Sequence, residues 1–208
     1  NFGEGGTFAG GALIFRVFAK EELKRLFNIM AARQTIVGPV EIGKDRNSHA
    51  LYAFEEVNSF DNVRLDYTTT KLPAKRYFLP FKEDLATFSI DADDWQKKVD
   101  YNIKHPYIFF GLHACDINAL NKLDKVLLGS VYPMPYYAAK RKNMFIIGLD
   151  CVPQHFCFCR SMGTDTALHG FDMFITELGA KYFVEILTDT AYNFLKNIET
   201  EEPKEKDH

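Results

Sequence analysis

The hydrophobic pattern is strongest in the second half of the chain, where it predicts a βαβ unit. Residues 107–112 and 144–149 are two short, almost entirely apolar runs, which are typical of buried strands. Between them, residues 116–128 repeat isoleucine and leucine at helical spacing, and Asp116 stands where a helix N-cap is expected. A strand, a helix and another strand in this order favour parallel neighbours in one sheet.

The rest of the chain carries weaker patterns of both kinds. Two further helices are expected, at 18–33 and 191–198, with Thr188 or Asp189 capping the second. Strands are expected at 35–43 (broken at Gly38-Pro39), 49–57 and 62–69, and a late hairpin at 172–178 and 181–187 around Gly179. The remaining segments are predicted as an exposed basic aromatic stretch at 75–78, a short helix at 81–88, and connections at 91–98, 130–144 and 160–170.

These elements together predict a single α/β domain with a mixed sheet, a βαβ unit, a late β-hairpin and flanking helices. We expect the domain to span residues 16–198. The glycine-rich residues 1–15 before it are expected to be flexible, because they cannot bury enough apolar surface to order themselves. Residues 199–208 form a charged tail.

Net charge excludes several classes of partner. The chain carries −3 overall, and the tail alone holds five acids and two lysines, so the body is electrically balanced. A balanced body gives no basic surplus for binding nucleic acid or an anionic membrane. No apolar run reaches the length of a membrane helix and no export signal is visible, so we expect a cytoplasmic protein with no membrane insertion.

All four cysteines lie in one stretch of the chain. Cys115 and Cys151 follow the two apolar runs, and Cys157 and Cys159 form a Cys-Phe-Cys unit shortly afterwards. The carboxyl ends of parallel strands open onto the same edge of a sheet, where α/β proteins place their sites. We therefore expect Cys115 and Cys151 to share that edge.

The spacing of these cysteines favours a metal centre over disulfides. A bond between Cys157 and Cys159 would close a small strained ring, and disulfides are rare without export. Four thiolates suit either zinc or an iron–sulfur cluster. The pattern C-x₃₅-C-x₅-C-x-C contains neither the paired knuckles of zinc sites nor the ferredoxin run. Spacing alone therefore favours a cluster and leaves zinc and unligated thiols open.

Several segments resemble the hydrogenase (sulfhydrogenase) β-subunit family, to which one component of anaerobic sulfite reductase also belongs. They are FGLHACDINAL at 110–120, IIGLDC at 146–151, CFCRSMG at 157–163 and, upstream, LPAKRYFLPFKEDL at 72–85. Four single residues accompany these segments: Asp124, Tyr137, Arg141 and Asp172. The resemblance covers about residues 72–195.

The resemblance implies an electron-transfer subunit of an anaerobic, multi-subunit oxidoreductase of hydrogenase or reductase type. In this family Cys115, Cys151, Cys157 and Cys159 would be the four ligands of one [4Fe-4S] cluster. Its partners would be other redox subunits of ferredoxin, flavoprotein or hydrogenase type. Family members typically continue into a two-cluster ferredoxin domain, and because no further cysteine is present we expect this chain to lack it.

Residues beside the cysteines are candidates for tuning a cluster rather than for catalysis. His113, His155, Arg160 and Ser161 lie within a few positions of a predicted ligand and could donate hydrogen bonds. No serine–histidine–aspartate set or paired carboxylates stand in a recognisable frame, so no catalytic residue is predicted. The alternative hypothesis is a zinc-stabilised structural subunit of a complex.

Overall fold

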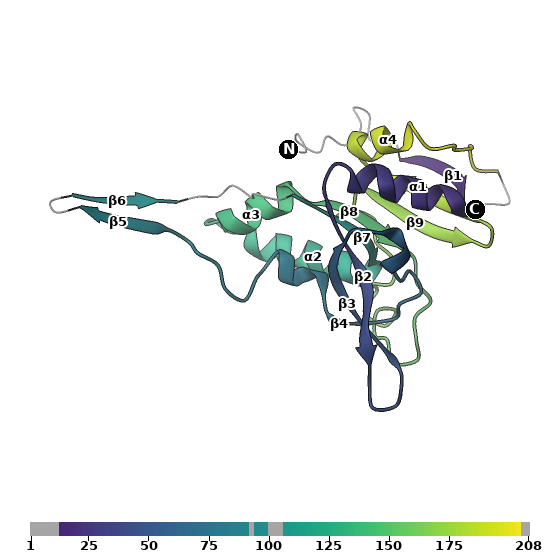
Figure 1. Cartoon of the computed structure of the whole chain (residues 1–208), viewed down its shortest axis with the longest axis horizontal. Helices are drawn as coiled ribbons and strands as arrows, with labels where there is room; N and C mark the ends of the chain where they lie inside the picture. The colour runs from purple at the N-terminus through teal and green to yellow at the C-terminus, as the bar shows by residue number, and fades with distance from the viewer. Residues whose placement is uncertain (1–12, 92–93, 100–105, 205–208) are drawn as a thin grey trace.

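The protein folds around one mixed sheet, which confirms the predicted α/β domain. The computed structural model describes residues 13–91, 94–99 and 106–204. Within these residues the main sheet has eight strands in the order β1-β10-β9-β8-β7-β2-β3-β4 (Figure 1). Most of the segment expected to be flexible lies outside the described residues.

The centre of the sheet is the predicted βαβ unit. β7 (Tyr107–His113) and β8 (Phe145–Leu149) are parallel neighbours, and α2 (Ala114–Leu127) connects them together with α3 (Pro135–Lys142). The prediction of a plain connection at 130–144 was wrong in part, because α3 forms within it. Pro135 stands at the first position of this helix, where proline is tolerated.

Both faces of the sheet are covered, as the fully apolar strands require. On one face of β8, Phe145 packs against Phe194 of α4 (Asp189–Leu195), with ring centroids 5.3 Å apart. On the opposite face, Gly148 lies against Ile117 of α2. Burial on both faces explains why these strands read as continuous hydrophobic runs and not as alternating ones.

Replacing Gly148 with alanine is expected to destabilise the fold. A Cβ there would lie 2.1 Å from Cδ2 of Phe174 and 3.0 Å from Cδ1 of Ile117, both in the core. Overpacking of this kind costs roughly 1–3 kcal/mol. Urea unfolding should show this loss for Gly148→Ala and less than about 0.5 kcal/mol for Ser89→Ala at an exposed position. Equal stability of the two variants would contradict the close packing at Gly148.

The two ends of the sequence meet at one edge of the sheet. β1 (Ile14–Ala19) pairs antiparallel with β10 (Lys181–Ile186), which forms the predicted hairpin with β9 (Met173–Leu178) through Gly179 at a φ of 62°. α1 (Lys20–Ala31) therefore begins later than the predicted 18–33, because residues up to Ala19 are drawn into β1. As expected, Thr188 caps α4, accepting a hydrogen bond from the Ala191 amide.

The other half of the sheet corrects two predictions. β2 (Thr35–Lys44) runs without a break through Gly38-Pro39 to pair with β3 (Ala50–Val57). Its ladder to β7 covers only Thr35–Val37, so beyond that point β2 has a neighbour on one side only, where proline is tolerated. The expected strand at 62–69 is irregular, apart from a 3₁₀ turn, η1 (Phe60–Asn62), and β4 is only Thr70–Leu72.

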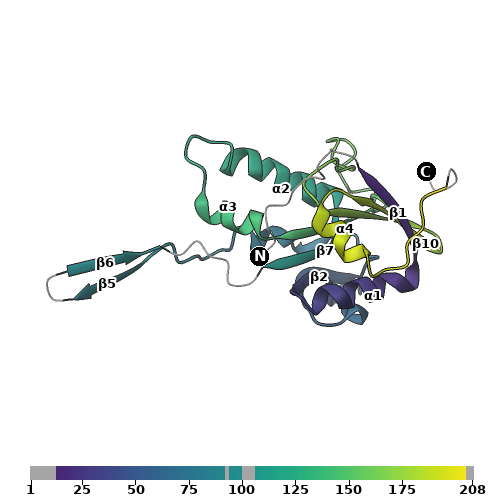
Figure 2. The same ribbon diagram turned by 90° about the horizontal axis from the view of Figure 1, so that it is seen from above.

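The segment after β4 also differs from its prediction. Residues 75–78 are not an exposed stretch, because η2 (Ala74–Tyr77) turns Phe78 into the core, where it stacks on Phe109. The predicted helix at 81–88 and connection at 91–98 instead contribute β5 (Thr87–Asp91) and β6 (Asp94–Lys98), an antiparallel hairpin. This hairpin projects as an arm from the body of the molecule (Figures 1 and 2).

Candidate metal centre

Parallel pairing places two of the four cysteines on one edge of the sheet. His113 ends β7 and pairs with Leu149, which ends β8. Cys115 stands in the first turn of α2, and Cys151 follows Asp150 just after β8. The prediction that Cys115 and Cys151 share one sheet edge is therefore correct, because the register aligns the carboxyl ends of both strands. Asp116 does not cap α2 as predicted, since His113 occupies the N-cap position and no side chain caps the helix.

The other two cysteines lie in a compact turn of the following loop. The Cys157 amide donates to the carbonyl of Gln154 at 2.9 Å, and the Cys159 carbonyl accepts from the Thr164 amide at 2.8 Å. Backbone hydrogen bonds thus help shape the Cys-Phe-Cys unit. All four cysteines are free thiols, Cys115 exposed and the others half-buried.

Cys115 and Cys151 interact electrostatically with each other and with cysteines of the following loop. Cys115 is exposed at the surface, yet protein atoms crowd its thiol enough to raise its pKa to about 12, with further contributions from Asp116, Cys151 and Cys159. Burial likewise raises the pKa of Cys151 to about 11, with contributions from Asp150, Cys159 and Cys157. Cys115 and Cys151 therefore keep their protons at neutral pH unless a cation stabilises the thiolates.

The four side chains do not close around a single ion. Among the described residues, no group of three or more histidine, cysteine, aspartate or glutamate side chains is arranged to hold one metal ion. Metal binding releases the protons of thiol ligands, so a centre here would require the cysteines to lose their protons and converge. Four soft sulfur donors, one in the first turn of α2 and three in the loop between β8 and β9, nevertheless form a donor set that suits an iron–sulfur cluster.

A buried histidine and tyrosine lie under this edge. The rings of His113 and Tyr67 stack face to face with centroids 4.0 Å apart, and the Tyr67 hydroxyl donates to the carbonyl of Gly111 at 2.8 Å. Burial lowers the pKa of His113 to about 4, so its ring is neutral, and its buried Nε2 has no hydrogen-bond partner among the described residues. Tyr67 was missed from the sequence, where it belonged to a predicted half-exposed strand.

The remaining predicted neighbours lie on the surface. His155 is exposed, with its ring edge-on to Phe156. Arg160 is exposed and approaches Asp165 at 3.7 Å, and Ser161 is also exposed. Their assignment as tuning residues stays a prediction.

A polar network holds the cysteine-bearing loop against α2. Arg141 of α3 bonds through Nε to Asp124 at 3.0 Å and through a terminal nitrogen to the Gly170 carbonyl at 3.2 Å. Asp124 also accepts from the Tyr137 hydroxyl at 2.7 Å. Asn118 and Asn121 donate to carbonyls of the same loop, at Thr166 and His169. The network explains why Asp124, Tyr137 and Arg141 accompany the cysteine motifs in the sequence.

Removing the Arg141 guanidinium is expected to loosen this loop. Arg141→Gln breaks the pair with Asp124, and neither side chain is more than about a quarter exposed, so we expect a loss of roughly 1–3 kcal/mol in unfolding free energy. Limited proteolysis should also cut residues 157–171 faster. Arg25→Gln, which alters an exposed pair with Glu22, is the control and should cost less than about 0.5 kcal/mol.

An open cavity of about 430 Å³ adjoins Cys151. Residues 65–68 line one side of it, Asp150 to Val152 line another, and Glu177 and Gly179 of the β9–β10 hairpin complete it. The cavity thus lies on the same edge of the sheet as the thiols.

Comparison with known proteins supports the family resemblance. No family model matches the chain. It is 39% identical over 175 residues to the sulfhydrogenase 2 subunit beta of Pyrococcus furiosus, an alignment that covers 84% of this chain and 49% of that relative. The chain therefore spans about half the length of the relative. Among the described residues, moreover, no helix has both the length and the apolar character needed to cross a bilayer. On this identity and these motifs, the chain belongs to the hydrogenase (sulfhydrogenase) β-subunit family.

Proposed function

We propose that this chain is an electron-transfer subunit of a multi-subunit redox enzyme and carries one [4Fe-4S] cluster. Cys115, Cys151, Cys157 and Cys159 would be its four ligands. The observation that carries the proposal is the register of β7 and β8, which brings Cys115 and Cys151 to one sheet edge, where burial and the neighbouring cysteines of the loop raise the pKa of both thiols. Once deprotonated, these thiolates would repel one another, and a cationic iron core would relieve that repulsion.

The cluster, when bound, would supply one-electron chemistry, and the chain would hold and shield it. Cys115 is fixed by the first turn of α2, and Cys151 by the end of β8, so two ligands stand on rigid elements. The unpartnered, buried Nε2 of the neutral His113 is available for a hydrogen bond at this edge, and hydrogen bonds to cluster sulfurs raise the reduction potential. No residue is proposed to make or break bonds in a substrate.

The surface around the cysteines indicates the kind of partner that the chain would meet. Apolar side chains surround the cysteines on the loop, among them Val152, Phe156 and Phe158, each more than half exposed. Exposed apolar surface around a redox centre suits a partner protein that covers it. We propose partners of ferredoxin, flavoprotein or hydrogenase type, in an anaerobic cytoplasm, in keeping with a relative that is a sulfhydrogenase subunit.

Anaerobic purification tests the proposal directly. We expect about four iron and four sulfide per chain, a broad visible absorption, and an electron paramagnetic resonance signal on one-electron reduction. The alternative, a zinc-stabilised structural subunit, would give a colourless protein with one zinc. That result, or iron bound without sulfide, would refute the cluster.

A further inference from the structure

An apolar groove runs along α2 on the side away from the sheet. It has a volume of about 450 Å³. Leu72 and Leu79, on either side of η2, form one wall, and Ala119, Leu123 and Val126 of α2 form the other. Leu79 and Leu123 also pack against the core, so the floor of the groove is part of the folded domain. It is therefore a preformed feature of this surface.

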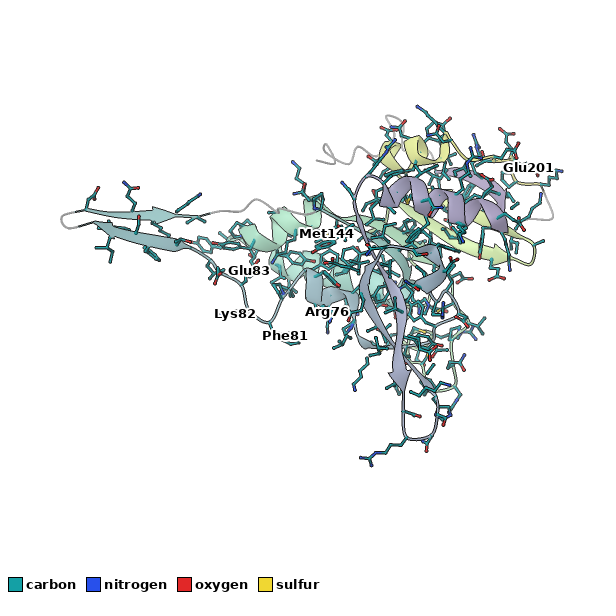
Figure 3. The ribbon with its side chains drawn as sticks, in the orientation of Figure 1. Arg76, Phe81, Lys82, Glu83, Met144 and Glu201 are labelled. Atoms are coloured by element: carbon teal, nitrogen blue, oxygen red, sulfur yellow. The ribbon has the colours of Figure 1, made fainter. Side chains whose placement is uncertain are left out.

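The rim of this groove exposes large apolar side chains. Phe81 is fully exposed and Val126 is 68% exposed. Phe81 lies at the bend where the chain leaves the body towards the arm (Figure 3). Contiguous apolar surface of this kind marks interaction sites in folded proteins.

The charged residues that line the groove are all cationic. They are Lys75, Arg76 and Lys122, and no carboxylate of the residues that the structure describes lines it. Arg76 is held in place by Glu55 at 2.8 Å and by the Phe54 carbonyl. Since the body of the chain as a whole is electrically balanced, this concentration of positive charge is a local property and favours an acidic ligand.

The groove and the candidate metal centre share one helix. Cys115 is in the first turn of α2, and Ala119 is one turn further, about 6 Å along the helix axis. Lys75 is close enough to Asp116 to influence its pKa. A chain bound in the groove therefore lies next to the cysteines.

We propose that this groove docks a segment of a redox partner protein in which apolar side chains are flanked by aspartate and glutamate. The apolar side chains would fill the space between Leu79 and Leu123, and the carboxylates would meet Lys75 and Lys122. That the partner exchanges electrons with this chain rests on the proposed function. The docking itself rests only on the groove.

Peptide binding to the full, iron-free chain tests the docking separately from the cluster. The probe is a fluorescent synthetic 12-residue peptide with leucine and phenylalanine at helical i, i+4 spacing and glutamate elsewhere; the comparison peptide has lysine in place of every glutamate. Anisotropy should show at least tenfold tighter binding of the glutamate peptide, and that preference should shrink as salt rises.

Matched variants locate the site. Val126→Glu and Lys122→Glu should each weaken binding at least fivefold. Val131→Glu at another exposed valine and Lys125→Glu on the same helix should change it less than twofold. Equal binding of the two peptides, or equal effects of groove and control variants, would overturn the proposal. So would self-association that Val126→Glu abolishes, since the occupant would then be a second copy.

Discussion

Replacing Cys151 with serine is expected to reduce the bound iron from about four ions per chain to fewer than one. Cys151 follows Asp150, whose amide is held by the Ile175 carbonyl of β9, and the chain contains no fifth cysteine to replace it. Serine preserves size but is a poor ligand for iron in place of a soft thiolate. Iron and sulfide analysis of anaerobically reconstituted protein measures the loss.

The stability of the same variant separates a bound cluster from a structural role of the cysteine itself. Without metal, Cys151→Ser and the unmodified chain should unfold at the same temperature within about 2 °C, because Cys151 is half-buried and makes no disulfide. With metal, only the unmodified chain should gain stability. Ser161→Ala, an exposed position in the same loop, serves as the control and should retain its iron. Full iron content in Cys151→Ser would remove this residue from the ligand set.

Replacing Asp172 with alanine is expected to cost roughly 3 kcal/mol of unfolding free energy, or about 6–12 °C in melting temperature. The Asp172 carboxylate accepts from the buried Ile146 amide at 2.8 Å and from the Thr188 hydroxyl at 2.9 Å. It thus ties the start of β8 to the start of α4. Alanine would leave the Ile146 amide buried without this partner. Thermal and urea unfolding measure the loss.

Two further variants separate the hydrogen bonds from the charge. Asp172→Asn keeps an acceptor for Ile146 and can donate to Thr188, so it should lose less than about 1 kcal/mol at neutral pH. Asp189→Ala, an exposed aspartate at the start of the same helix, should also lose less than about 1 kcal/mol. A loss as large in Asp189→Ala as in Asp172→Ala would contradict the role of the buried carboxylate.

The charge of Asp172 also makes a pH-dependent contribution. Burial raises the pKa of this carboxyl above its ordinary value of 3.8, despite the hydrogen bonds that favour its ionised form. The folded chain thus holds this proton more tightly than the unfolded chain. Its contribution to stability is full below pH 3.8 and is lost as the pH rises through the folded pKa. The stability difference between the unmodified chain and Asp172→Asn should therefore shift in favour of Asp172→Asn over that window.

The segments that the sequence mispredicted share one physical cause. Residues 62–69 were assigned as a strand by local alternation, and residues 75–78 as exposed by charge. Instead 62–69 is irregular and Phe78 is buried, because Tyr67 and Phe78 pack on β7, more than thirty residues away in sequence. The hairpin β5–β6 escaped prediction because few of its side chains meet a core, so no burial pattern marks it.

The βαβ centre, the late hairpin and the shared edge of Cys115 and Cys151 could all be predicted from sequence patterns alone. These follow from continuous apolar runs and from the rule that parallel strands open onto one edge. Three features could be seen only in the folded chain: how the cysteine loop is anchored, the stacking of Tyr67 on His113, and the cationic groove along α2. Those features depend on contacts between segments far apart in the chain, and local periodicity carries no information about such contacts.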